Sequence, residues 1–302
     1  MSVETDLRHE SFTSLDTDVR TCSFNVEDRT KAHLINLLAA AGCHELAVRV
    51  SQCCSEFRAL ECENGHRFKH VPTSRCRYRL CVDCARERQH RALKRLWPML
   101  RGFQRAYPHD RPVVITLTIK SSHEPLAVID KRFKGWFSRL RRSEKWKHRI
   151  RAAVAGFEFT WSAVEGWHYH AHILAYRKAW YEQAELAAQW QRITKGAGQI
   201  VDIQSKGNLK TMASEVLKYC FKPSDIFRWD VQQVREFNAL RRIKLSECYG
   251  ELRGLKVETD DDLADDRRRE HEDLGYGSPC PDCGEPLYPV TVPRSLVPDN
   301  TS

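Results

Sequence analysis

The chain has 302 residues, of which 41% are hydrophobic and 29% charged, a balance typical of a folded protein and not of a disordered one. It contains no run near the roughly 18–20 apolar residues of a membrane span. Its first residues, "MSVETDLRHE", do not resemble a secretory signal, so we expect a cytoplasmic protein. The net charge of +9 favours a polyanionic partner. The twelve cysteines stand in short, metal-like spacings, which argues against a disulfide framework.

In chain order, a loose leader and a helix precede a Cys-rich, turn-rich module and a basic amphipathic helix, which we expect to bend or end near Pro98. Strands are expected at "PVVITLTI", "AVAGFEFTWS" and "GWHYHAHILAY", of which the second and third form a hairpin, and a further short strand is expected at "QIVDIQ". Helices are expected at "NLKTMASEVLKYCF" and "WDVQQVREFNALRRIKL". This order predicts an α+β fold with a central antiparallel sheet, flanking helices and small zinc-binding modules. The expected segments are a leader and helix at 1–52, the Cys-rich zinc module and basic helix at 53–107, the α+β core at 108–227, a helical extension at 228–257, a charged linker at 258–275 and a CxxC tail at 276–302.

Three histidines alternate with apolar residues in the third of these strands. Successive side chains of a strand point to opposite faces, so His168, His170 and His172 share one face. If the hairpin turn centres on Val164, Glu158 of the preceding strand lies opposite His170. Two histidines and a carboxylate, with positions left open, suit a divalent ion such as Mg²⁺ or Mn²⁺ at a phosphate. The sequence therefore predicts a catalytic metal site of His170, His172 and Glu158. His168 is either a further ligand or a rim residue that touches DNA.

The helix pattern "SEVLKYCFK" contains a second group of reactive side chains. Glu215 and Tyr219 are four residues apart, so they lie on one side of the helix, with Lys218 and Lys222 beside them. Taken alone, this pattern is more typical of an ordinary helix surface than of a catalytic site.

The ordered segments "VITLTI", "EFT", "GWHYHAHIL" and "EVLKYCFKPSD" resemble the rolling-circle replication initiators (Rep proteins) of small bacterial plasmids, members of the HUH endonuclease superfamily. "CRYRLCVDCARER" is similar to the cysteine segment of that family, so the resemblance covers roughly residues 60–226. It implies an HUH endonuclease core with an RRM-like (ferredoxin-like) palm. His170 and His172 match the family's histidine pair, and Glu158 matches its strand carboxylate. The single tyrosine in the helix motif indicates the single-tyrosine type.

The resemblance also implies a role for each residue of the helix motif. Tyr219 would attack the scissile phosphate, which leaves a 5′-phosphotyrosine and a free 3′-OH. Glu215 would activate water for the terminating hydrolysis, and Lys218 or Lys222 would lower the tyrosine pKa or contact phosphate. The implied function is nicking and strand transfer on single-stranded origin DNA to start and end rolling-circle plasmid replication. The alternatives are a single-strand DNA transposase of the same superfamily and a non-catalytic, zinc-dependent DNA-binding regulator.

The cysteines predict structural zinc. Cys81 and Cys84 form a CxxC knuckle, and Cys76 and Cys62 complete a tetrahedral set, for which His66 is a substitute ligand. His70 is a further substitute ligand. Cys53 and Cys54 are either additional ligands or buried thiols.

A second knuckle, "CPDC", places Cys280 and Cys283 near the C-terminal end of the sequence. The pattern supplies no obvious second half for this zinc site. Cys248 or a partner chain could complete it.

Two basic runs are expected to flank the candidate site. Residues 131–151 contain ten Lys/Arg and one acid, with aromatics between them, and residues 86–105 contain seven Lys/Arg. Basic side chains neutralise phosphates and aromatic rings stack on unpaired bases. The expected DNA contacts are Thr116, Thr118, Arg139, Arg141, Arg142, Lys145 and Lys147. The expected partners are single-stranded and hairpin origin DNA, with a host helicase and polymerase as further candidates and no membrane.

Overall fold

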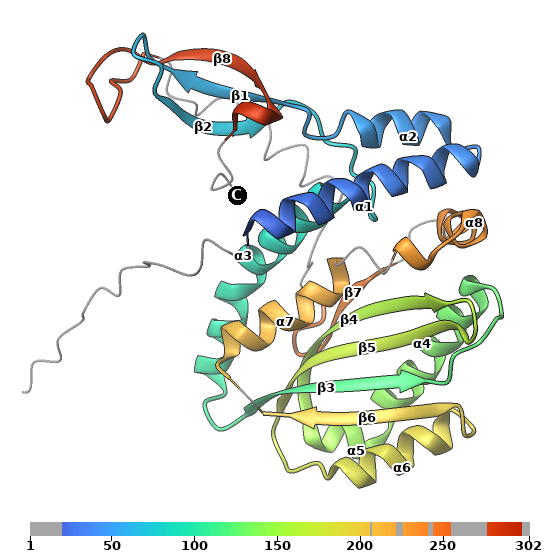
Figure 1. The fold of residues 1–302 in the computed structure, drawn as a ribbon. Coiled ribbons are helices and arrows are strands. Elements are labelled where there is room, and N and C mark those ends of the chain that lie inside the picture. The colour runs from blue at the N-terminus through green and yellow to red at the C-terminus, as the bar shows by residue number, and fades with distance from the viewer. Residues whose placement is uncertain (1–19, 206, 222–225, 241–243, 255–276, 298–302) are drawn as a thin grey trace, which may run out of the picture.

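The computed structural model describes the chain except for residues 1–19, 206, 222–225, 241–243, 255–276 and 298–302. It confirms the α+β class, with two antiparallel sheets and helices around them (Figure 1). The larger sheet has five strands in the order β6-β3-β5-β4-β7, and the smaller has three in the order β2-β1-β8. In the part of the chain that is described, no helix combines the length and apolar character needed to cross a membrane.

The larger sheet contains all four expected strands, with "QIVDIQ" in β6, and one strand that was not expected, β7. Its strands are β3 (Arg111–Ile119), β4 (Ile150–Ser162), β5 (Gly166–Arg177), β6 (Gly198–Gln204) and β7 (Ser246–Gly250). The edge strand β7 pairs with β4, from Ala152↔Gly250 to Gly156↔Ser246. The expectation of one helix through "WDVQQVREFNALRRIKL" is wrong in extent, because helix α8 ends at Ala239.

The β4–β5 hairpin has the register that the sequence predicts. Glu158 lies opposite His170, and the strands are joined through Ser162↔Gly166. Gly166 has a φ of +87°, and a Cβ there would lie 2.3 Å from the carbonyl oxygen of Ser122. Only glycine fits this close approach, which brings the end of the hairpin against the segment that follows β3.

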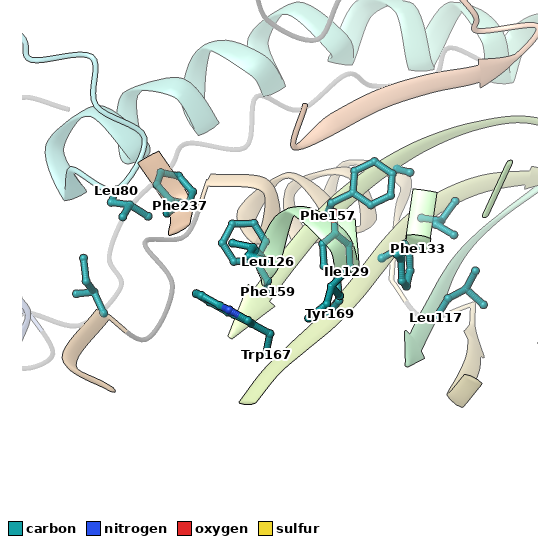
Figure 2. Close-up of a cluster of buried hydrophobic side chains, with 14 of the residues drawn as sticks. Leu80, Leu117, Leu126, Ile129, Phe133, Phe157, Phe159, Trp167, Tyr169 and Phe237 are labelled. Atoms are coloured by element: carbon teal, nitrogen blue, oxygen red, sulfur yellow. The ribbon is translucent and has the colours of Figure 1, made fainter. Parts of the chain in front are cut away.

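One face of the larger sheet is covered by α4 (Leu126–Arg142), α5 (Glu144–Arg149) and α6 (Gln183–Ile193). Apolar residues of α4 pack here on the odd-numbered side chains of the strands, as Figure 2 shows for Phe133 and Ile129 beside Phe157 and Tyr169. The ring centroids of Phe133 and Tyr169 are 4.6 Å apart. Each fully buried aromatic side chain of this kind contributes about 1.5–3 kcal/mol to the free energy of unfolding.

The opposite face is covered by α7 (Leu209–Phe221), with α3 (Val82–Ala106) packed behind it (Figure 1). Leu174 and Tyr176 of β5 pack here against Val216 of α7 and Leu96 of α3. Since side chains alternate along β5, the three histidines share this face with Leu174 and Tyr176. Helix α3 continues beyond Pro98 to Ala106, so the alternative that the helix ends near the proline is wrong.

The smaller sheet pairs a segment from the N-terminal part of the described chain with one from its C-terminal part. Strand β1 (Glu56–Glu61) lies between β2 (Arg67–Pro72) and the C-terminal strand β8 (Tyr288–Pro293). Both pairings are antiparallel, and β8 is in register with all six residues of β1. The remaining elements are α1 (Arg20–Ala40), α2 (His44–Ser51), α8 (Val231–Ala239) and the short 3-10 helices η1 (Ile226–Arg228) and η2 (Arg294–Leu296).

Candidate functional site

The three histidines form a row along β5. The ring centroids of His168 and His170 are 4.2 Å apart, and those of His170 and His172 are 6.0 Å apart, with nearly parallel rings in both pairs. Burial, with a contribution from His168, lowers the pKa of His170 to about 4. The imidazole of His170 is therefore neutral at pH 7 and has a lone pair available for a ligand.

Glu158 supplies the acidic group beside this row. Its side chain is 8% exposed, and its Oε2 lies 3.5 Å from Nε2 of His172. On the other side of β5, Oγ1 of Thr116 lies 3.4 Å from Nδ1 of His172, a contact that orients the ring. Two imidazoles and a carboxylate fit the donor chemistry of Mn²⁺ and related divalent ions. The donor atoms of His170, His172 and Glu158 do not all lie within 4.8 Å of one another. In two cysteine-rich groups elsewhere in the described residues, the possible ligand atoms do lie that close together.

His168 is the member of the row nearest the β4–β5 turn. Oγ of Ser121 lies 3.2 Å from its Nδ1, and no described group bonds its buried Nε2. Four residues of strand separate His168 from His172, so their Cα atoms are about 13 Å apart. One ion with metal–nitrogen distances of about 2.0–2.1 Å does not reach both rings. In this conformation, His168 and His172 are therefore too far apart to bind the same ion.

Helix α7, which carries the second predicted group, lies on the histidine side of the sheet. Val216 is buried against the sheet and α3, while Glu215 and Lys218 are exposed. Tyr219 belongs to the same helix, one turn after Glu215. The side chain of Tyr219 lies outside the described residues, as does Lys222 as a whole.

The basic run 131–151 does not flank the histidine row, although the sequence predicts that it does. It forms α4, α5 and the start of β4, and both helices cover the face of the sheet opposite the histidines. Three of its four aromatic residues, Phe133, Phe137 and Trp146, are buried in the core, and the fourth, Trp136, is half-buried against the same core. The expected DNA contacts on these two helices therefore lie on the far side of the sheet from the histidine row: Arg139, Arg141, Arg142, Lys145 and Lys147. The run 86–105 belongs to α3, which does lie on the histidine side.

The two threonines of β3 differ in their surroundings. Thr116 is half-buried and points toward His172. Thr118 is 2% exposed, and its Oγ1 accepts a 2.7 Å hydrogen bond from the N–H of Ile200. The expectation that Thr118 contacts DNA is corrected, because its hydroxyl joins β3 to β6.

A first cysteine cluster lies where α3 begins. The sulfur atoms of Cys53, Cys76, Cys81 and Cys84 lie within 4.8 Å of one another, and all four residues are buried. The Sγ–Sγ distances are 3.5 Å for Cys53–Cys84 and 3.7 Å for both Cys76–Cys84 and Cys53–Cys81. Zinc–sulfur bonds of about 2.3 Å in a tetrahedron give sulfur separations of about 3.8 Å. The cluster could therefore hold a metal ion such as zinc.

A second cluster consists of Cys62, His66, Cys280 and Cys283. The prediction that Cys62 joins Cys76, Cys81 and Cys84 is wrong, because Cys53 is the fourth member of that group. By sequence spacing alone, either Cys53 or Cys62 could complete a zinc site with Cys76, Cys81 and Cys84. The path of the β1–β2 hairpin between the two clusters determines which of the two cysteines does so.

Cys62 and His66 lie beside the C-terminal knuckle of Cys280 and Cys283 and complete its set of four possible ligands. The expectation that Cys248 could complete this set is therefore wrong. Cys248 lies on β7 and pairs with Val154 in the larger sheet. His70 is buried in β2 and joins neither described cluster. Burial lowers its pKa.

A family model described as "Replication protein" (Rep_1) matches residues 67–276, which is more than half of the chain. The matched range contains the histidine row, Glu158, helix α7 and three cysteines of the first cluster, and it leaves out all four residues of the second. Comparison with curated proteins and with solved structures found no match.

Proposed function

The chain belongs to the replication protein family, and from this premise we propose that it is a plasmid replication initiator that acts by nicking DNA. The proposed reaction is cleavage of single-stranded or hairpin origin DNA by a tyrosine, followed by strand transfer, which starts and ends rolling-circle replication. The observation that supports this proposal is that one face of the sheet carries both the histidine row with Glu158 and the helix with Glu215 and Tyr219.

In the proposed mechanism, the hydroxyl oxygen of Tyr219 attacks the scissile phosphorus. The bond from phosphorus to the 3′-oxygen breaks, so the 5′ phosphate stays on the tyrosine and the 3′-OH becomes available to a polymerase. A divalent ion held by His170, His172 and Glu158 would stabilise the charge that develops on the phosphate. Glu215, one helical turn before the tyrosine, would accept a proton from the water that ends the reaction. Exposed Lys218 would neutralise a phosphate, and Lys222 is proposed for the same role.

Two further assignments belong to this proposal. The first cysteine cluster would hold a structural zinc ion, because four thiolates leave no open position for a substrate. A host helicase and polymerase would act on the nicked DNA.

The direct test is covalent capture. Wild-type protein incubated with labelled single-stranded origin DNA and Mg²⁺ or Mn²⁺ is expected to give a protein–DNA adduct that survives denaturation. An adduct in which the protein is joined to the 5′ phosphate at the nick supports the proposal. If the protein binds the origin tightly but forms no adduct with either ion, the non-catalytic regulator becomes the better interpretation.

The metal assignment predicts a difference between neighbouring histidines. His170→Ala removes one of the proposed ligands and is expected to weaken Mn²⁺ binding by about 10²-fold or more, measured by titration calorimetry without DNA. His168→Ala removes a ring from the same row and is expected to change this affinity by less than about threefold, since His168 lies outside the set. Equal losses in the two variants would contradict the assignment.

A further inference from the structure

The second cysteine cluster joins segments from opposite ends of the described chain. Cys62 and Cys283, whose sulfur atoms are 3.6 Å apart, are separated by 221 residues. We propose that Cys62, His66, Cys280 and Cys283 form a second zinc site, a zinc ribbon assembled from two distant halves. Zinc at this site holds the C-terminal strand β8 against strand β1 in the smaller sheet.

The distances between the ligand atoms agree with one zinc ion. Bonds of about 2.3 Å to sulfur and about 2.0–2.1 Å to nitrogen give tetrahedral edges of about 3.8 Å between two sulfurs and about 3.6 Å between sulfur and nitrogen. The observed edges are 3.6 Å for Cys62 and Cys283, and 3.5 Å between Sγ of Cys280 and Nδ1 of His66. A disulfide between Cys62 and Cys283 would leave Cys280 and His66 without a role in this arrangement.

Each half of the site is a turn closed by the backbone. The N–H of Cys62 donates to the carbonyl oxygen of His66 at 3.1 Å, and the N–H of Cys280 donates to that of Glu285 at 2.7 Å. Two similar knuckles thus present their ligands toward each other, as the two halves of a zinc ribbon do.

Apolar packing around the site is small. Among the described residues, the local cluster contains Leu60, Leu287 and two of the cysteine ligands, with Phe68 and Val71 packed against it. Val292, near the other end of β8, packs into the main core, so the end of the sheet at the cysteine cluster has only this small cluster to stabilise it without a metal. Metal binding supplies the free energy that keeps the distant halves together.

Strand β8 then extends from the second cluster to the first. It pairs with β1 along the whole strand, and the next residue, Arg294, donates its backbone N–H to the carbonyl oxygen of Ser55 at 3.0 Å. The Arg294 guanidinium lies 3.8 Å from the carboxylate of Asp83. Asp83 lies in the first turn of α3, between the first-cluster ligands Cys81 and Cys84. The tail therefore connects both metal clusters and contacts the helix that packs behind α7.

All four proposed ligands lie outside the range that matches the replication protein family. The inference does not depend on the nicking activity, and it can fail while the proposed function holds.

The test uses full-length protein, with zinc measured by mass spectrometry and backbone protection by hydrogen exchange. We expect Cys283→Ser, at an exposed position, to lower the zinc content by one ion per chain. Hydrogen exchange of residues 288–293 is expected to accelerate by about tenfold or more, because their pairing with β1 opens. Strands β3 to β5 should keep their protection, which shows that the core is still folded.

Cys248→Ser is the matched control, since this half-buried cysteine belongs to neither described cluster. It is expected to leave both the zinc content and β8 protection unchanged. Unchanged zinc in Cys283→Ser would overturn the site, and zinc loss without faster exchange in β8 would overturn its role in holding the tail. If zinc instead makes the wild-type protein dimeric and β8 protection depends on protein concentration, a second copy supplies the tail and the intramolecular site is wrong.

Discussion

Replacing Tyr219 with phenylalanine is expected to abolish the covalent protein–DNA adduct and to slow origin cleavage by roughly 10³-fold or more. The substitution removes only the nucleophilic oxygen, so no bond to the phosphate can form. Removal of a nucleophile leaves only the contributions of binding and charge stabilisation, which is why the expected loss is so large. The measurement is the rate of adduct formation on labelled single-stranded origin DNA, together with the affinity for the same DNA.

The affinity distinguishes a catalytic role from a structural one. Tyr219→Phe should bind the origin as tightly as the wild-type protein and unfold at the same temperature. Tyr288→Phe is a suitable control, because this exposed tyrosine lies on β8 in the smaller sheet. It should form the adduct at the wild-type rate. An adduct formed by Tyr219→Phe would identify another nucleophile, and loss of DNA binding in that variant would show that the tyrosine positions the substrate.

The β4–β5 hairpin is the part of the site that could be predicted from the sequence. Strict alternation put three histidines on one face, and a short turn fixed the register that brings Glu158 opposite His170. Both signals are local, within about twenty residues of chain. The position of Tyr219 one turn after Glu215 on a helix could be predicted for the same reason.

The positions of helices relative to the sheet could not be predicted in this way. The run 131–151 is basic on one side and apolar on the other, and such a helix can pack on either face of a sheet. Leu174 and Tyr176 of β5 pack with α7, whereas Phe133 and Phe137 of α4 pack on the odd-numbered side of the strand. The charge pattern of α4 does not indicate on which face of the sheet the helix packs. Because α4 packs on the odd-numbered face, its arginines lie far from the histidines.

The cysteine groupings show the same limit. Cys53 and Cys62 stand on either side of β1, and either could complete a set with the CxxC knuckle by spacing alone. Strand β1 carries Cys62 away from Cys53, toward the C-terminal knuckle. That partner is more than 200 residues distant, and pairing between such segments has no local signature in the sequence.

The first cysteine cluster gives the second large prediction, which concerns stability. Cys53→Ser is expected to remove one zinc ion per chain and to lower the free energy of unfolding by about 4–5 kcal/mol or more, as loss of a structural metal does. Cys81 precedes α3 directly and Cys84 lies in its first turn, so the start of the helix that packs behind α7 should lose its anchor. Origin cleavage should therefore fall along with stability. Zinc content and thermal unfolding measure the two effects.

The adjacent cysteine provides the control for this prediction. Cys54 is also buried, and its sulfur lies 3.9 Å from that of Cys53, yet it is not a member of the four-cysteine group. Cys54→Ser should keep the zinc ion and lose only the packing of one small side chain, about 1 kcal/mol. Loss of zinc from Cys54→Ser with retention in Cys53→Ser would reverse the assignment of the fourth ligand. Retention of zinc in both variants would show that the cluster does not need this part of the chain to bind metal.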